Sequence, residues 1–402
     1  MSQILMNRRS FIRQTIMTSA VFIIKYKPCF SMNIPLQETS SYKTYKDKAM
    51  GCWLGAAIAD AMGGPVECQH FKRIATKYPD FNVFLPYRNP PGLIKLGPGY
   101  ALDSAPGNIT DDTYIRLDLA RFLLDNDLPY TARRFAAWLL EHADFSNWWK
   151  VAVQPLRRIE SEKTTPEKAG LKHKQGGGGG WWQPIAMLYA GDPEGASTVT
   201  ADLCRIWKAP LEQDILSSVV AGQAAAFKAN ATIDSVVDAV MEDSGPLAKK
   251  LFTRAIEIAR KAKTRNQLYE MLYQHCLVKE CSKDIDGPMP RQVEPKDYAD
   301  GFYSGILFAE QQPLALAYFV YGQGDPMKTV LTAVKGGRDA DSIATNSVSW
   351  LEAMAGELVW PKKWLQTVQQ ANIARVNLEQ TAHDLVERAL KNGTVRFGQM
   401  RT

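Results

Sequence analysis

The spacing of apolar residues after position 43 constrains the fold of this chain most strongly. Apolar residues recur three and four positions apart over most of that region, which is the period of an amphipathic helix. Alternating β-branched residues, which are typical of half-buried strands, are nearly missing. The pattern predicts helices over residues 114–124, 131–140, 211–227, 247–262, 298–310, 327–334 and 382–390.

These segments favour an all-α protein with a single, orthogonally packed helical domain over residues 43–395. Hydrophobic residues make up 46% of the chain, which is enough for a large core. Proline and glycine punctuate the periodic segments, but no long linker divides them. We expect residues 32–42 to be a linker that precedes the domain.

The segment 50–63 predicts a helix at the centre of the domain. Small residues at positions 51, 55, 56, 57, 59 and 61 leave room for a neighbouring helix to approach closely. Asp60 is polar among apolar neighbours and needs partners if it is buried. Glu67 follows a Gly-Gly-Pro turn, which suits a side chain aimed into a cleft.

The first 31 residues resemble a twin-arginine export signal. Arg8 and Arg9 precede an apolar segment over residues 15–24, which is shorter than a transmembrane helix. Cleavage after Ser31 would place the domain in the bacterial periplasm or at the cell surface, without a stable membrane span. An uncleaved or vestigial basic tail is the alternative, because the usual small-residue cleavage motif is absent.

The net charge of +6 does not indicate nucleic-acid binding. Residues 1–31 hold five basic residues and no acidic ones. Without these five, the 48 basic residues fall to 43, against 42 acidic residues in the whole chain. The rest of the chain is therefore close to neutral, and we expect no nucleic-acid partner.

Two acidic clusters, each at the start of a helix-like segment, indicate a split metal site. They are Thr-Asp-Asp-Thr at residues 110–113 and Asp-Ala-Asp-Ser at residues 339–342. Each cluster alone is equally compatible with a helix cap. Together, crowded carboxylates need a compensating cation, and oxygen ligands favour Mg²⁺ first and Mn²⁺ second.

The motifs together resemble the ADP-ribosylglycohydrolase family over about residues 43–360. The family's opening motif matches Gly51, Gly55, Asp60, Ala61, Gly63, Pro65 and Glu67, and its Thr-Asp-Asp-Thr motif matches residues 110–113. Its late motif matches Gly337, Arg338, Asp339, Asp341 and Ser342, and a further match covers residues 190–196. The resemblance implies an all-α fold of this family's type.

The resemblance also implies a binuclear site and a reaction. It implies that two Mg²⁺ ions, or Mn²⁺, are held by Thr110, Asp111, Asp112, Asp339, Asp341 and Ser342. The expected reaction is the hydrolysis of a ribosyl glycosidic bond, with Glu67 as the residue that accepts a proton or positions the ribose. Asp112 is the rival general base.

The chain departs from the family at the loop before residue 190. Here it has a glycine run followed by two tryptophans, and we expect the substrate to contact Gly177, Gly178, Gly179, Gly180, Trp181 and Trp182. Backbone N–H groups suit a phosphate or sugar, and indole faces suit stacking. The alternative is a flexible loop ahead of a core aromatic pair.

Three classes of function remain open from the sequence. The first is a hydrolase that acts on an ADP-ribosylated protein or a ribosylated small molecule. The second is an exported hydrolase of a nucleoside or another small glycoside. Export would favour such a substrate, because it would lie outside the membrane. The third is a non-catalytic ADP-ribose-binding, sugar-binding or crystallin-like member of the family.

Overall fold

The computed structural model of the chain describes residues 40–67, 69–79, 81–88, 103–172, 178–277, 308–356 and 359–396. Residues 40–402 group into one compact unit, apart from residues 1–39. The predicted export signal and the predicted linker as far as residue 39 lie outside the described residues. The first helix begins at Ser40, three residues before the predicted start of the domain.

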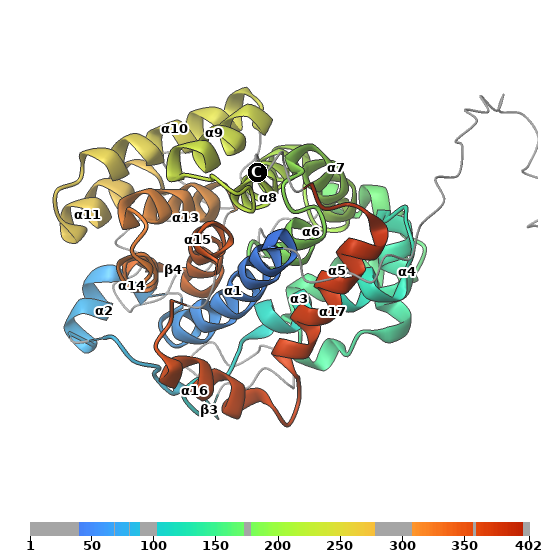
Figure 1. Cartoon of the computed structure of the whole chain (residues 1–402), viewed down its shortest axis with the longest axis horizontal. Coiled ribbons are helices and arrows are strands. Elements are labelled where there is room, and N and C mark those ends of the chain that lie inside the picture. Colours follow the sequence, from blue (N-terminus) through green and yellow to red (C-terminus); the bar gives the residue numbers. More distant parts are fainter. Residues whose placement is uncertain are drawn as a thin grey trace, which may run out of the picture. The chain divides into compact units, whose positions relative to one another are not determined.

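Helices dominate the described residues, and the all-α prediction is confirmed (Figure 1). None of the described helices is long and apolar enough to cross a membrane. The α-helices are α1 (Ser40–Gly63), α2 (Phe71–Lys77), α3 (Asp111–Asp125), α4 (Ala132–His142), α5 (Lys150–Glu160), α6 (Gln183–Leu188), α7 (Pro193–Leu203), α8 (Pro210–Ala226), α9 (Ile233–Asp243), α10 (Pro246–Lys261), α11 (Arg265–His275), α13 (Phe308–Gly322), α14 (Pro326–Gly336), α15 (Ala340–Ala355), α16 (Lys362–Asn372) and α17 (Leu378–Asn392).

Shorter elements connect these helices. The 3₁₀ helices are η1 (Gly64–Val66), η2 (Phe145–Asn147), η3 (Pro166–Lys172) and η4 (Cys204–Ile206). Strand β1 (Gln69–His70) pairs with β4 (Gly337–Arg338), and β2 (Tyr87–Arg88) pairs with β3 (Asp103–Ser104), both antiparallel. Within the described ranges the strands are therefore confined to two-residue ladders, in agreement with the weak strand signal of the sequence.

The predicted helices match the structure wherever the structure describes them. The segments 114–124, 131–140, 211–227, 247–262, 327–334 and 382–390 fall on α3, α4, α8, α10, α14 and α17. Most of the predicted helix 298–310 lies outside the described residues, and α13 begins at Phe308. The apolar period is clear in α4, α10 and α17 because each of them buries one face in the core, whereas α3 and α8 are buried over most of their length.

Helix α1 crosses the centre of the helical unit and packs along α15 (Figure 1). Small residues on α1 allow this approach, as the sequence predicted. A Cβ atom at Gly55 would lie 2.8 Å from Cγ of Glu352 on α15 and 3.1 Å from Nε1 of Trp360. A larger residue at this position would force the two central helices apart.

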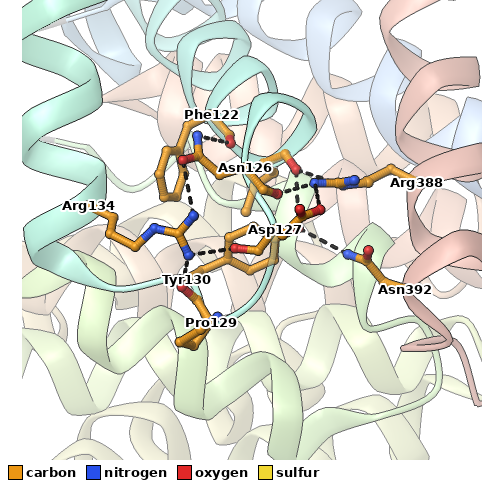
Figure 2. A network of polar contacts seen from close by, with 9 residues as sticks. Phe122, Asn126, Asp127, Pro129, Tyr130, Arg134, Arg388 and Asn392 are labelled. Carbon is orange, nitrogen blue, oxygen red and sulfur yellow. Dashed lines mark hydrogen bonds and ion pairs between the residues drawn. The ribbon is translucent and has the colours of Figure 1, made fainter. Parts of the chain in front are cut away.

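Figure 2 shows the polar network that holds the C-terminal end of α3. Arg388 of α17 donates to the carbonyl oxygens of Leu123 and Asn126 and lies 3.1 Å from Oδ1 of Asp127. Arg134 of α4 donates to the carbonyl oxygen of Asp127 at 2.6 Å. These bonds satisfy carbonyl groups at and beyond the helix end that have no intrahelical donor. They fix α3 between α4 and α17.

Candidate metal centre

Asp60 of α1 anchors the start of α3. The hydroxyl of Thr110, the N-cap of α3, donates to Oδ1 of Asp60 at 2.5 Å, and the backbone N–H of Thr110 donates to Oδ2 at 3.0 Å. Thr113 also donates its hydroxyl to Asp60 and accepts a bond from Arg116 at 2.9 Å. Burial raises the pKa of Asp60, and the bonds from Thr110 and Thr113 lower it. Thr110 and Thr113 of the first acidic cluster therefore both donate hydrogen bonds to the buried carboxylate of Asp60.

The β1–β4 ladder brings the segment of Glu67 to the start of α15. Gln69 pairs with Arg338, and a Cβ atom at Gly337 would lie 2.1 Å from the carbonyl oxygen of Gln69. Gly337 and Arg338 have φ angles of 70° and 63°, which turn the chain sharply before α15. The left-handed conformation costs Arg338 about 1 kcal/mol or more. Its buried ion pair with Glu310, with Nε 2.6 Å from Oε1, holds this turn.

Three carboxylates from two distant segments meet as a result. Glu67, Asp339 and Asp341 each place one oxygen so that all three lie within 4.8 Å of one another. Asp339 and Asp341 are buried, whereas Glu67 is half-buried. Gly63 permits this meeting, because a Cβ atom there would lie 2.4 Å from the backbone nitrogen of Asp341.

The electrostatics of this group call for a cation. Burial raises the pKa of Asp339 to about 6. Burial, then the charges of Glu67 and Asp339, raise the pKa of Asp341 well above its ordinary value. Burial and the neighbouring Asp111, Asp339 and Asp60 do the same to the pKa of Asp112. Carboxylates held this way favour a divalent ion, and their oxygen atoms suit Mg²⁺, Mn²⁺ or Ca²⁺.

The other sequence-predicted ligands lie around this group without belonging to it. Ser342 donates its hydroxyl to Oδ2 of Asp112, which joins the two acidic clusters. The Thr110 hydroxyl lies 3.4 Å from Oδ2 of Asp341. Asp111 is half-buried at the first position of α3. The structure thus brings the two clusters together, because Ser342 donates its hydroxyl to Asp112 and its backbone N–H to Oδ1 of Asp341.

The glycine and tryptophan segment lies beside Asp112, but its indole rings are in the core. Trp181 and Trp182 are 2% and 1% exposed, and their rings pack with Trp207 at centroid distances of 5.5 and 6.3 Å. In this structure they form the core aromatic pair of the alternative interpretation rather than an open surface for a sugar. The stacking expectation is corrected accordingly, because buried indole faces already have partners.

The glycines of this segment are tightly enclosed as well. Gly178 has a φ angle of 89°, and a Cβ atom at Gly180 would lie 2.5 Å from Oδ2 of Asp112. The carbonyl oxygens of Gly178 and Gly179 accept bonds from Trp182 and Asn346. Gly177 lies outside the described residues. The described part of the loop is therefore a packed wall next to Asp112.

Sequence reasoning missed three residues that act on the site. Gln311 of α13 donates to Oδ2 of Asp339, and Lys208 is buried with its charge close enough to lower the pKa of Asp339. Asp60 was noted as polar but not assigned to the site. The signal for Asp60 and Gln311 was a polar side chain within an apolar helix. Lys208 carried no signal, because it lies in a short turn after η4.

A helical unit that gathers buried carboxylates from distant segments fits the class of protein that the sequence motifs predicted. The chain belongs to the ADP-ribosylglycohydrolase family, since the sequence model of that family matches residues 41–394. Members of this family are hydrolases that cleave glycosidic bonds.

Two relatives give more detail. The ADP-ribosyl-[dinitrogen reductase] glycohydrolase of Rhodospirillum rubrum is 32% identical over 123 residues, which are 30% of this chain and 37% of that protein. The match thus spans little more than a third of that relative's length. A solved structure titled "ADP-ribosylglycohydrolase-related protein complex" is 18% identical with a TM-score of 0.52, covering 86% of this chain and 99% of that one. This second likeness shows the shared fold.

Proposed function

We propose that this protein is a metal-dependent hydrolase that cleaves a ribosyl glycosidic bond in an ADP-ribosylated substrate. One observation carries the proposal: Glu67, Asp339 and Asp341 meet within 4.8 Å in a member of the ADP-ribosylglycohydrolase family. Like charges this close are unfavourable unless a cation or protons neutralise them. A cation-binding role accounts for the cluster and for the family's chemistry at once.

Two Mg²⁺ ions, or Mn²⁺, suit the proposed donor set. The proposed ligands are the hydroxyls and carboxylates of Thr110, Asp111, Asp112, Asp339, Asp341 and Ser342, with Glu67 beside them. When bound, such ions lower the pKa of water and orient sugar hydroxyls. Gln311 and Asp60 hold Asp339 and Thr110 in place through their hydrogen bonds.

Glu67 is the better of the two candidate general bases. Both oxygens of Asp112 accept hydrogen bonds, one from Trp181 and one from Ser342, and its side chain is buried. Glu67 is half-buried at the exit of η1. A proton acceptor needs access to the attacking water, so we assign this role to Glu67. Breaking the glycosidic bond leaves an oxocarbenium-like ribose, which neighbouring carboxylates stabilise electrostatically.

The name of the Rhodospirillum rubrum relative indicates a substrate class. That protein is named for an ADP-ribosylated dinitrogen reductase, so an ADP-ribosylated protein is the first candidate substrate here. Ribosylated small molecules share the same bond. ADP-ribosyl-arginine, ADP-ribosyl-serine and a nucleoside panel are therefore the probes that separate these substrates.

The test incubates the purified full chain with Mg²⁺ and each substrate and measures hydrolysis as the release of ADP-ribose. Asp339→Ala should abolish hydrolysis and divalent-ion binding, because it removes a buried carboxylate of the central group. Glu67→Gln should lower turnover at least 100-fold while keeping ion binding, because the amide retains an oxygen but cannot accept the proton. Calorimetric titration with Mn²⁺ measures the ion binding of both variants.

The helical circular dichroism of both variants should match that of the unmodified protein, which controls for folding. Full turnover after treatment with EDTA would overturn the metal-dependent mechanism. Unchanged turnover in Glu67→Gln would remove Glu67 from its role and leave Asp112 as the base. Ion binding without release of any product from the panel would favour the non-catalytic alternative.

A further inference from the structure

We propose that Trp181 is a positioning residue that orients Asp112 for divalent-ion binding, in place of the substrate-stacking role that its sequence suggested. The inference rests on the proposed function, because Asp112 is one of the proposed ligands. The indole N–H, rather than the face of the ring, is the functional group.

The hydrogen bond between these residues is short and buried. Nε1 of Trp181 donates to Oδ1 of Asp112 at 2.6 Å, and both side chains are almost fully buried, at 2% and 6% exposure. Ser342 occupies the other oxygen, Oδ2. An indole N–H can only donate, so this bond fixes the orientation of the Asp112 carboxylate relative to the loop.

Neighbouring aromatic rings hold the indole ring of Trp181 in a fixed orientation. Trp181 packs against Trp148, Trp182 and Trp207, with centroid distances of 6.2, 6.5 and 5.5 Å. These contacts leave the indole little freedom to rotate. A donor that cannot move fixes its acceptor more precisely than a flexible side chain does.

Buried side-chain amides hold the backbone of the loop just before Trp181. Asn346 of α15 donates to the carbonyl oxygen of Gly179 at 2.8 Å and to Oε1 of Gln312 at 2.9 Å. Gln183 and Gln223 both donate to Oδ1 of Asn346 at 3.0 Å. Because Asn346 follows Ser342 by one helical turn, the same helix carries a proposed ligand and the support of the loop.

Gly180 completes the fit between this loop and Asp112. A Cβ atom at Gly180 would lie 2.5 Å from Oδ2 of Asp112 and 3.3 Å from Cα of Ser342. The loop therefore approaches Asp112 from two sides, through the open backbone at Gly180 and through the N–H of Trp181.

The chain supplies a closely matched control. Trp148 is 1% exposed, belongs to the same aromatic cluster, and donates its Nε1 at 2.9 Å to Oδ2 of Asp118. Asp118 lies on the same helix as Asp112 and is also buried. Replacing either tryptophan by phenylalanine therefore removes one Trp–Asp hydrogen bond and similar ring volume, but only Trp181 contacts a proposed ligand.

The experiment compares Mn²⁺ affinity in the full-length protein, Trp181→Phe and Trp148→Phe, by counting free Mn²⁺ with electron paramagnetic resonance. We expect Trp181→Phe to weaken Mn²⁺ binding 10- to 100-fold, the range found when outer partners of metal ligands are removed. Trp148→Phe keeps an aromatic ring against Trp181 and should change Mn²⁺ binding less than 3-fold. Melting temperatures in EDTA should fall by similar amounts in both variants, which separates positioning from stability.

A second replacement covers the case in which Trp181→Phe does not fold. Incorporating benzothienylalanine at position 181 exchanges the indole N–H for sulfur and keeps the size of the ring. It should also weaken Mn²⁺ binding 10-fold or more. Equal affinity in the unmodified protein and in the position 181 variants would overturn the inference. Absence of Mn²⁺ binding in the unmodified protein would instead overturn the metal part of the proposed function.

Discussion

At the scale of single residues, buried polar side chains decide how this site is built. Asp60 looks like a flaw in an apolar helix when it is read from the sequence. In the structure it accepts three hydrogen bonds from Thr110 and Thr113 and joins α1 to α3. A buried polar group is stable in the core when its hydrogen bonds are made, and those of Asp60 fix the start of α3 against α1.

Glu352 is the contrasting case on α15. Neither of its carboxylate oxygens has a hydrogen-bond partner among the described residues, and its side chain is fully buried. Burial raises the pKa of Glu352 from its ordinary 4.5 to about 8. The folded protein thus keeps a proton at neutral pH that the unfolded chain releases.

This difference predicts how stability changes with pH. Between pH 4.5 and about 8 the folded state binds more protons than the unfolded state, so the free energy of unfolding falls as pH rises and levels off above pH 8. Glu352→Gln should remove that loss. We expect it to stabilise the protein by about 2–4 kcal/mol at pH 8.5 and by little at pH 4.5.

Urea denaturation at both pH values measures this difference. Glu270→Gln is the control, because Glu270 lies exposed on α11. The control should leave the pH profile unchanged. A profile for Glu352→Gln that runs parallel to that of the unmodified protein would show that the buried carboxyl does not cause the pH dependence.

At the scale of elements, the close approach of α1 and α15 decides whether the site exists. Glycines in the C-terminal half of α1 allow this approach, with Gly55 facing Glu352 and Gly63 facing Asp341. The antiparallel β1–β4 ladder then fixes the register of Glu67 against Asp339. Helix packing and a two-residue ladder together place residues that are about 270 positions apart in the chain.

Gly63→Ala tests this dependence. Its Cβ atom would lie 2.4 Å from both the backbone nitrogen and Cα of Asp341, and a backbone atom cannot yield as a flexible side chain would. We expect a loss of about 2–3 kcal/mol in the free energy of unfolding, and weaker Mn²⁺ binding. Chemical denaturation and calorimetry measure the two effects.

Gly324→Ala provides the comparison for Gly63→Ala. Gly324 has a φ angle of 84° but open space around its Cβ position. The Gly324→Ala variant should lose about 1 kcal/mol of unfolding free energy through backbone strain and keep full Mn²⁺ affinity. Equal ion affinity in both variants would show that the contact between Gly63 and Asp341 does not shape the site.

At the scale of the whole molecule, the proposed metal centre joins parts of the chain that the fold brings together from afar. The segments of Glu67, of Asp112 and of Asp339 belong to different helices, and the network in Figure 2 holds the far end of α3. A ligand bound across these segments stabilises the folded state, because the unfolded chain cannot form the site.

Divalent ions should therefore raise global stability. At Mn²⁺ or Mg²⁺ concentrations 100 times the dissociation constant, we expect about 2.7 kcal/mol more unfolding free energy than in EDTA. Thermal or urea denaturation with and without the ion measures this gain. Asp339→Ala should show no gain, and an equal gain in that variant would place the stabilising ion elsewhere on the protein.

Much of the fold and part of the site could be predicted from the sequence. The periods of α4, α10 and α17 are clear because each helix buries one face, and the acidic clusters stand out at helix starts. The burial of Trp181 and Trp182 could not be read there, since an aromatic pair after glycines looks the same in a binding loop and in a core. The export signal stays a prediction, because residues 1–39 lie outside the described residues.

The sequence by itself determined the helical class, the family and the residue types of the candidate site, because periodicity and motif chemistry are local properties of a chain. Only the tertiary structure decided which of those residues meet. The partners of Asp60, the bond between Trp181 and Asp112 and the closeness of Glu67 to Asp339 depend on helix packing and on backbone turns. Distances between remote segments follow from packing in three dimensions, and no local pattern records them.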